Sequence, residues 1–463
     1  MSIIQGNAKT GASRGFYPKE IAGSLRFNDD DSADLSRTFT SEGDRTKWTW
    51  SAWVKRANIS LSEEATLFSS HFGASTSGSF SFRFDTDDTL EVVQYTTVRR
   101  KTNAVYRDTS AWYHIVLQVD TNGDFFTIWV NGEQVTSFST SSNPSVGSNV
   151  GVNYSTQHTI GRNDAAVNKF FDGYLAEVHF LNGIAATADN FGETKSGIWV
   201  AKAYTGEHDS AAQITAGTTN GFYLDFADSA AIGDDESGNG NDWTPNNFTA
   251  SDVVLDSPTD NFPTLNPLSL GSQTLDNGNL EVVGSTTAWS HARATQSPAT
   301  GKWYCETTII FENDGATDRI GVGVINIDTL TLANLAPTEY LGETADSWAY
   351  FENGTVYNSG ANTGTTTTYT TGDVIGMALD LDSATQTITW YKNNTEIVQK
   401  NLADGRWTFG VTTYHIGEGA INFGQQTFAY TPPTDYLALS TANLPDPSID
   451  PAEDETPDDY FNT

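Results

Sequence analysis

The chain has 463 residues with 24 basic and 58 acidic side chains, and its formal net charge is −34. This balance argues against nucleic acid as a partner, because phosphate binding needs a basic, counterion-releasing face. No stretch approaches the roughly 20 apolar residues of a membrane span, and the first residues lack the apolar segment of a signal peptide, so we expect synthesis in a cytoplasm and no membrane insertion. The single cysteine, Cys305, excludes an internal disulfide framework and is expected to be a small apolar side chain in a strand.

Residues 1–23 show no clear period and are expected to form an N-terminal arm. Strand signals then follow one another to about residue 200, separated by turns: "KWTWSAWVKR", "SFSFRF", "LEVVQYTT", "AWYHIVLQVD", "DFFTIWVNGEQV" and "GYLAEVHFLNG". Ile115, Leu117 and Val119 alternate with more polar residues before an Asn122-Gly123 turn, and the alternation resumes after it. A period of two on both sides of a tight turn predicts a β-hairpin.

Two turn-rich stretches, "DESGNGNDW" and "SPTDNFPTLNP", separate this block from a second strand-rich block that begins near position 275. The second block repeats the hairpin pattern, with apolar residues alternating from Ile375 to Leu381 and again at Ile388 and Trp390. We therefore predict an all-β protein made of two antiparallel β-sandwiches in tandem. The expected parts are an arm at 1–23, a first domain at 24–262, a linker at 263–274, a second domain at 275–438 and an acidic tail at 439–463.

The segments "SLRFNDDDSADLS", "WTWSAWVKR", "WYHIVLQVD", "FTIWVNGEQV", "TIGR" and "FDGYLAEVHFLNG" occur in this order in the first block. As an ensemble they resemble the laminin-G-like, concanavalin A-like lectin and glucanase sandwiches. The usual opening element of that family is missing before Leu25, whereas "GFYLDFADSAAIGDDESGNGNDW" at 221–243 resembles it. We therefore interpret the first sandwich as circularly permuted, with 221–250 as a late strand.

The second block carries "GKWYCETTI", "RIGVGV", "YLGETADSWAYFENGTVYNSG", "YTTGDVIGMALDLDSATQTITWYKNN" and "INFGQQTFAYTPP" in order. These segments resemble the SPRY domain over about 275–435, with one departure at the Asn393-Asn394 turn. Both resemblances imply concanavalin-like, jelly-roll-like sandwiches, so the two hairpins are equivalent pieces of scaffold. Trp129 and Trp390 are accordingly expected in cores rather than as sugar platforms.

The tandem of sandwiches, with its turn-rich joints and acidic end, resembles modular virion proteins of tailed bacteriophages, marine ones in particular. The resemblance implies a virion protein that is made in the bacterial host cytoplasm and that contacts other virion proteins. Whether the chain forms a homo-oligomer stays open. Two functions stay open. One is a tail-fibre or receptor-binding appendage that recognises a host surface glycan or protein, and the other is a structural decoration or adaptor protein on the capsid or tail.

No catalytic constellation is evident in the sequence. The β-glucanase pattern E-x-D-x-x-E, a G-x-S-x-G elbow, an H-E-x-x-H helix and a Walker loop do not occur. The nearest acid pairs, Asp85 with Asp87 and Glu343 with Asp346, lie beside turn residues and are interpreted as solvated loop charges rather than as the two carboxylates of a glycosidase. We therefore expect a protein that is not an enzyme.

Calcium is the cofactor that one acidic loop favours. Asp235, Ser237 and Asn239 stand at alternate positions before Gly240, which is the oxygen spacing that wraps a hard cation. The bidentate acid that an EF-hand needs at the twelfth position is lacking, and the alternative is an Asx- and Gly-rich turn that closes the sandwich. A second acid cluster, Asp29 to Asp31, stays open between a solvated turn and a cation site.

For ligand capture, the resemblance to SPRY domains implies loops gathered at one end of the sandwich. The matching positions with suitable side chains are Asp346, Trp348, Tyr414 and His415. Trp348 lies in "DSWAYF", where the family often has an aromatic residue for packing, so a core role is its alternative. The tail from Pro445 is acidic without a basic residue, and we expect it to be extended unless it docks on a partner protein.

Overall fold

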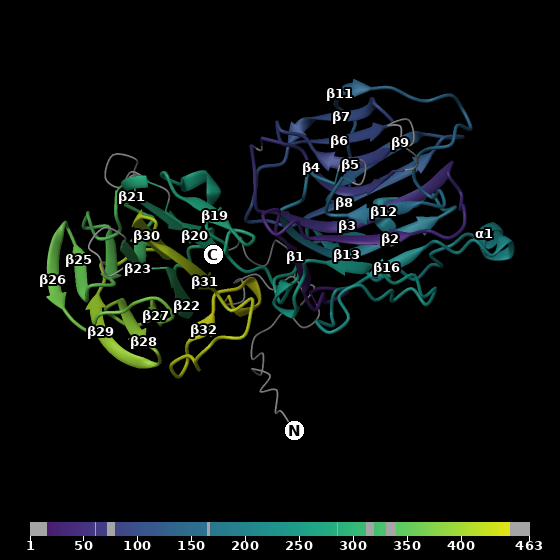
Figure 1. Cartoon of the computed structure of the whole chain (residues 1–463). Coiled ribbons are helices and arrows are strands. Elements are labelled where there is room, and N and C mark those ends of the chain that lie inside the picture. The colour runs from purple at the N-terminus through teal and green to yellow at the C-terminus, as the bar shows by residue number, and fades with distance from the viewer. Residues whose placement is uncertain are drawn as a thin grey trace, which may run out of the picture.

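The computed structural model describes residues 16–60, 62–71, 79–163, 167–284, 286–311, 319–329 and 339–444. Most of the predicted arm, 1–15, and most of the predicted acidic tail, 445–463, lie outside these residues. The described residues are mainly strands and turns, as predicted, with one short α-helix, α1 (Ala211–Ala216). No helix in these ranges is both long and apolar enough to cross a membrane. The strands form two lobes, one coloured from purple to teal and the other from green to yellow (Figure 1).

The first lobe is a sandwich of two antiparallel sheets. In spatial order, the first sheet holds β10 (Glu133–Gln134), β9 (Phe125–Val130), β8 (Tyr113–Asp120), β3 (Lys47–Arg56), β13 (Gly173–Asn182), β1 (Ser24–Phe27) and β18 (Val253–Val254), and β16 (Phe222–Leu224) also pairs with β13. The second sheet holds β11 (Phe138–Ser141), β7 (Thr97–Val105), β6 (Thr89–Gln94), β5 (Phe80–Phe84), β4 (Ala65–Ser70), β12 (Gln157–Ile160), β2 (Asp34–Thr38) and β17 (Thr244–Asn246). A separate hairpin pairs β14 (Gly192–Lys195) with β15 (Ile198–Ala201).

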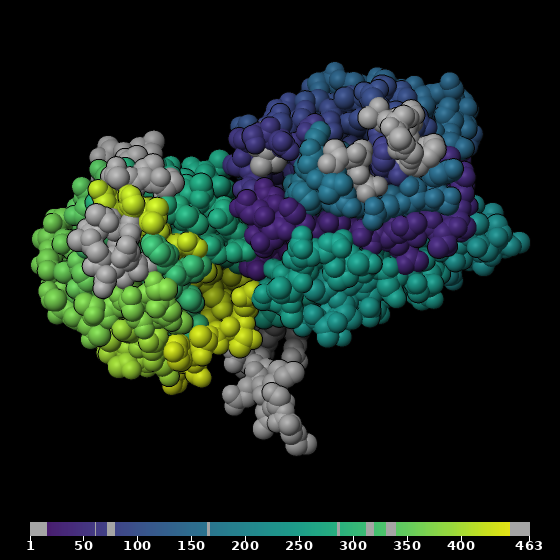
Figure 2. Space-filling view, viewed as in Figure 1, coloured from purple at the N-terminus to yellow at the C-terminus, as the bar shows by residue number. Residues whose placement is uncertain are grey.

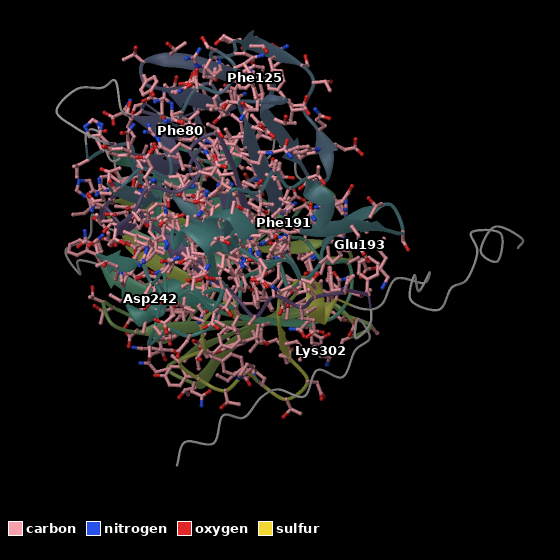
Figure 3. All side chains as sticks on the ribbon, turned by 90° about the vertical axis from the view of Figure 1, so that its right-hand side faces the viewer. Phe80, Phe125, Phe191, Glu193, Asp242 and Lys302 are labelled. Atoms are coloured by element: carbon pink, nitrogen blue, oxygen red, sulfur yellow. The ribbon has the colours of Figure 1, made fainter. Side chains whose placement is uncertain are left out.

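The core of the first sandwich follows from the alternation in its central strands. Trp48 and Trp50 of β3 point between the sheets, where Trp50 stacks at 6.3 Å on Phe68 of the opposite sheet. The alternate residues of β3 are buried as well, because further chain covers the outer face of this sheet. Trp129, expected in a core, is buried on that outer face with Phe191. In Figure 3, which turns the first sandwich toward the viewer, Phe191 lies in the middle of the molecule among packed side chains.

The segment 221–254 completes both sheets of the first sandwich. β16 extends β13, β17 pairs with β2, and β18 pairs with β1. Trp243, between β16 and β17, is 3% exposed and belongs to the core between the sheets. The late strand that the sequence predicts at 221–250 therefore corresponds to two short strands, one in each sheet.

The second lobe is also a sandwich. In spatial order, one sheet holds β19 (Thr274–Asp276), β20 (Glu281–Val283), β31 (Glu418–Asn422), β22 (Lys302–Phe311), β27 (Val374–Asp380), β28 (Thr387–Lys392) and β29 (Thr395–Asn401), and β32 (Leu437–Ala438) runs parallel to β22. The other sheet holds β21 (Thr286–Arg293), β30 (Trp407–His415), β23 (Arg319–Asn326), β24 (Ser347–Phe351), β25 (Thr355–Asn358) and β26 (Ala361–Thr365). Trp390 and Cys305 are both fully buried in its core, and the Trp390 indole N–H donates to the Val322 carbonyl at 3.0 Å.

The two sandwiches meet along a packed seam rather than through a free linker. Leu265, inside the predicted linker 263–274, is fully buried in the second core, and so is Leu439 at the start of the predicted tail. The Tyr174 hydroxyl of the first sandwich donates to the Gly278 carbonyl of the second at 2.7 Å. A side chain at Gly278 would meet that hydroxyl, because an added Cβ would lie 2.5 Å from it. The surfaces of the two lobes touch along their shared border (Figure 2).

Candidate ligand-binding face

Strand β23 carries two glycines on the outer face of its sheet. In "RIGVGV", Ile320, Val322 and Val324 point into the core, so Gly321 and Gly323 lie on the opposite face. An added Cβ at Gly321 would come within 2.7 Å of the Phe351 ring. The absence of a side chain therefore lets an aromatic ring lie directly on the sheet.

Five aromatic residues cluster on this outer face, which we call the aromatic face: Trp289, Tyr340, Phe351, Tyr357 and Tyr414. The Trp289 ring is central, with ring centroids 5.1 Å from Tyr340, 5.1 Å from Tyr414 and 5.6 Å from Phe351. Phe351 is 3% exposed and forms the floor, while the other four rings are partly exposed. Such rings, held by one another and by a sheet, are well placed to contact a ligand with little loss of side-chain freedom.

Strand register brings these rings together. Trp289 of β21 stands opposite Tyr414 of β30, and Tyr414 stands opposite Arg319 of β23. Arg319 is held by an ion pair with Glu352 at 2.7 Å. The aromatic face thus has a fixed, polar edge beside Tyr414.

The four predicted ligand residues do not form one rim. Val324 of β23 pairs with Trp348, whereas Arg319 of the same strand pairs with Tyr414, so the two aromatic residues are separated along the sheet by about five residues, or roughly 17 Å. His415 follows Tyr414 at the end of β30. Of the four, Tyr414 alone belongs to the aromatic face.

The other end of the sheet holds Asp346 and Trp348. Trp348 is partly buried against the core of the second sandwich, and the Lys400 ammonium lies 5.9 Å from its ring centroid. Asp346, in the turn before β24, accepts a hydrogen bond from the Thr329 hydroxyl at 2.5 Å. This geometry agrees with the packing role that was the alternative for Trp348.

Comparison with known proteins places both sandwiches in families. Residues 27–190 match the model of the concanavalin A-like lectin/glucanases superfamily, and residues 302–403 match the model of the SPRY domain. The chain carries a concanavalin A-like domain followed by a SPRY domain. None of the curated protein sequences matches it.

Solved structures similar to this chain include three SPRY-type or toxin structures. The SPRY domain of human HERC1 is 22% identical, with 35% of this chain and 99% of that chain covered and a TM-score of 0.29. The TRIM65 PSpry domain is 20% identical, with coverages of 35% and 88% and a TM-score of 0.27. Stonustoxin is 18% identical, with coverages of 35% and 26% and a TM-score of 0.27, so the chain spans about a quarter of that protein.

The loop with the predicted calcium spacing is saturated by hydrogen bonds. One Asp235 oxygen accepts the backbone N–H groups of Tyr223 and Ser237, both at 2.9 Å. The other oxygen accepts the Ser237 hydroxyl at 2.9 Å and the Asn241 backbone N–H at 2.8 Å. A carboxylate has about four lone-pair sites, and here all of them accept hydrogen bonds from the protein, so none is left to bind a cation.

The third residue of that loop is also engaged by protein groups. The Asn239 side-chain N–H donates to Asp209 at 2.7 Å and to the Gly221 carbonyl at 2.9 Å. Within the described part of the chain, no three His, Cys, Asp or Glu side chains are gathered so that they could hold a metal ion. Asp235, Ser237 and Asn239 therefore do not fit a calcium cage as they stand and form an Asx turn, and calcium at this loop stays a prediction.

A buried Ser-His pair in the concanavalin A-like domain was not foreseen from the sequence. Ser51 Oγ lies 3.0 Å from His114 Nε2, and the Trp199 indole N–H donates to His114 Nδ1 at 3.1 Å. Nδ1 therefore carries no proton, and the ring proton is on Nε2, directed at Ser51. A serine nucleophile needs the opposite tautomer, in which Nε2 accepts the hydroxyl proton. Burial lowers the pKa of His114 to about 3, so the ring is a neutral structural link.

The acid pairs considered for glycoside hydrolysis each have protein partners. Asp85 and Asp87 share the Lys101 ammonium, which lies 3.0 Å from Asp87. Glu343 accepts the backbone N–H of Tyr340 at 3.3 Å, next to the aromatic face. These contacts are those of structural loop charges.

Proposed function

We propose that this chain is a non-enzymatic virion protein of a tailed bacteriophage, a tail-fibre or receptor-binding appendage that recognises a host surface glycan or protein. The virion context rests on the resemblance of the tandem to modular virion proteins. The contact is assigned to the aromatic face of the SPRY domain, with other virion proteins holding the chain on the particle.

The observation that carries the assignment is the partly exposed ring cluster around Trp289. Scattered single aromatic residues are normal on a protein surface, but rings in mutual contact over a buried Phe351 floor are not. Tyr and Trp have few rotatable bonds and combine an apolar face with a polar tip. They therefore lose little side-chain entropy on binding while offering both apolar contact and a hydrogen-bonding group. The adjacent Arg319 and Glu352 pair offers polar contacts at the edge.

The test is adsorption of the purified chain to host cells. Tyr414→Ala removes one ring of the aromatic face and should weaken binding by about 2 kcal/mol, or roughly thirty-fold, with the melting temperature nearly unchanged. Tyr391→Ala is a matched control, because Tyr391 is a partly exposed tyrosine on β28 in the other sheet. It should leave adsorption intact.

Failure of the wild-type chain to adsorb to any cell that the parent particle infects would remove the adhesion role. The structural decoration or adaptor function would then take its place. Equal adsorption of wild type and Tyr414→Ala would instead keep adhesion and move the contact away from the aromatic face. Electron microscopy of intact particles with a labelled chain would locate the protein on head or tail.

A further inference from the structure

The side chain of Lys55, on β3, ends between two side chains of the segment that leaves the first sandwich. Its ammonium donates to Asp256 Oδ2 at 2.7 Å, to Asn261 Oδ1 at 2.8 Å and to the Phe262 carbonyl at 2.7 Å. The side chains of Lys55 and Asp256 are 0% and 1% exposed. The amide carbon of Asn261 is one bond from the accepting oxygen, so it lies within about 4 Å of the lysine nitrogen. An amine thus contacts a carboxyl group and a carboxamide at the same time.

The carboxamide of Asn261 is held in one orientation. Its side-chain N–H donates to the Ser110 carbonyl at 2.8 Å. Its backbone N–H donates to the Thr441 hydroxyl at 2.8 Å, and its carbonyl accepts the Thr441 N–H at 3.0 Å. An ammonium can only donate and a carbonyl can only accept, so these two partners fix which end of the amide is oxygen and which is nitrogen. The amide oxygen therefore faces Lys55.

The carboxyl group of Asp256 is also fixed, and its surroundings are apolar. Asp256 Oδ1 accepts the Trp112 indole N–H and the Phe262 backbone N–H, both at 3.2 Å, which leaves Oδ2 for Lys55. The Lys55 ammonium lies 5.7 Å from the centroid of the buried Tyr174 ring. Burial lowers the pKa of Lys55 and raises that of Asp256, and their mutual attraction opposes both shifts. The apolar surroundings thus favour the neutral, nucleophilic amine beside a neutral carboxylic acid more than water would.

We propose that Lys55 and Asn261 form an intramolecular isopeptide bond, with Asp256 as the group that transfers protons. Asp256 Oδ2 takes a proton from the ammonium, and the neutral Lys55 Nζ attacks Asn261 Cγ. The Nζ–Cγ bond forms and the Cγ–Nδ2 bond breaks. Ammonia leaves with a second proton from Nζ, which Asp256 relays to Nδ2. The reaction needs no oxidant and no other reactant, and Asp256 ends as a neutral acid, so no unpaired charge is left buried.

The bond would be a covalent cross-link within a chain that has a single cysteine. It joins β3 to the segment that follows β18, and the loop that it closes contains strands β4 to β18. A cross-link of this kind restricts the unfolded chain as a disulfide does. Until the bond forms, Lys55 and Asp256 are a buried ion pair beside an amide, which is the arrangement in the structure.

The test is mass spectrometry of the purified full chain. The wild type should be lighter than its sequence predicts by the mass of one ammonia, and peptide mapping should give a branched peptide that joins Lys55 to Asn261. Asn261→Ala and Lys55→Arg should keep their full masses. Asp256→Asn should form the bond at least about a hundred-fold more slowly. Lys47→Arg is the control on the same strand, because Lys47 pairs with Asp120 at 3.1 Å, and it should lose ammonia as the wild type does.

Asn261→Ala is the decisive variant because it keeps the ion pair of Lys55 with Asp256, and a cooperative melt would verify that it folds. The wild-type result does not depend on any variant. A folded wild type that keeps its full mass after prolonged incubation would overturn the proposal. Loss of ammonia without the branched peptide would overturn it too, because cyclisation at an Asn-Gly pair such as Asn122-Gly123 gives the same mass. A branched peptide at Asp256, formed with loss of water, would also contradict it and make the carboxyl group the acyl donor.

Discussion

The Lys55 ammonium donates to the Asp256 carboxylate at 2.7 Å, and the two side chains are 0% and 1% exposed. The same ammonium also bonds the Asn261 side chain at 2.8 Å and the Phe262 carbonyl at 2.7 Å. Lys55 comes from the middle of the concanavalin A-like domain, whereas Phe262 packs in the SPRY core. Burial lowers the pKa of Lys55 and raises that of Asp256, and their mutual attraction opposes both shifts. The Lys55 ammonium therefore fixes the segment 256–262, whose last residue packs in the SPRY core, against the concanavalin A-like domain.

Replacing the lysine should be strongly destabilising. Lys55→Met leaves Asp256 buried and unpaired, and we expect a loss of about 3–5 kcal/mol in the free energy of unfolding. Lys47→Met is a matched control on the same strand, because the ion pair of Lys47 with Asp120 is 38% and 17% exposed and should contribute about 1 kcal/mol or less. Denaturant titration of both variants measures the difference. A double variant, Lys55→Met with Asp256→Leu, should recover much of the loss, and equal costs for the two single variants would contradict the seam role.

Two aromatic residues of the SPRY domain should separate stability from binding. Trp390→Ala removes a fully buried ring and its hydrogen bond to Val322, and it should cost about 3–5 kcal/mol of stability. Tyr414 lies on the aromatic face, and Tyr414→Ala should lower the free energy of unfolding by about 1 kcal/mol or less. Thermal melts measure the loss of stability, and cell adsorption measures the loss of binding. Similar melting temperatures for the two variants would mean that Tyr414 is part of the packing.

Glu418 interacts with Glu281, and we expect this pair to make the free energy of unfolding fall as pH rises. Burial first, and then the hydrogen bond and charge of Glu281, raise the pKa of Glu418 to about 7 from 4.5. A carboxyl group whose folded pKa is raised contributes stability that is fully present below its unfolded pKa and is lost as pH rises through the folded value. Glu418→Gln should therefore melt higher than the wild type at about pH 8, and the difference should disappear below about pH 4. A difference that is the same at both pH values would exclude titration as its cause.

A truncated first domain should fail to fold. A chain that ends at Val200 loses β16, β17 and β18, together with Trp243 from the core. Strand β2 then keeps β12 on one side but loses β17 on the other. The exposed sheet edge should make it aggregate. A chain that ends just after Phe262 keeps every partner of Lys55 and should melt cooperatively. Equal cooperative melting of the two chains would show that 221–254 is not needed.

Local patterns predicted the hairpins well, because alternation reports which residues share one face of one strand. The hairpin of β8 and β9 pairs Leu117 with Ile128, as the period on each side of its turn implies. The aromatic face could not be predicted in this way. Trp289, Tyr340 and Tyr414 are distant in the sequence, and only the pairing order β21, β30, β23, β24 makes them neighbours. The resemblance to SPRY domains implied one rim for Trp348 and Tyr414. Strands β24 and β30 both pair antiparallel with β23 and therefore run in the same direction, so the start of β24 and the end of β30 lie at opposite ends of the sheet.

The position of β1 has a consequence for synthesis. This strand lies between β13 and β18, so its neighbours are residues 173–175 on one side and 253–254 on the other. On the ribosome, β1 emerges well before its partners at 173–175 and 253–254, and pairing over such a separation carries a slow loop-closure step. The nascent chain meanwhile exposes unpaired edges that chaperones would have to shield. Limited proteolysis of stalled ribosomal complexes should show protection of the first domain only after residue 262 has left the exit tunnel.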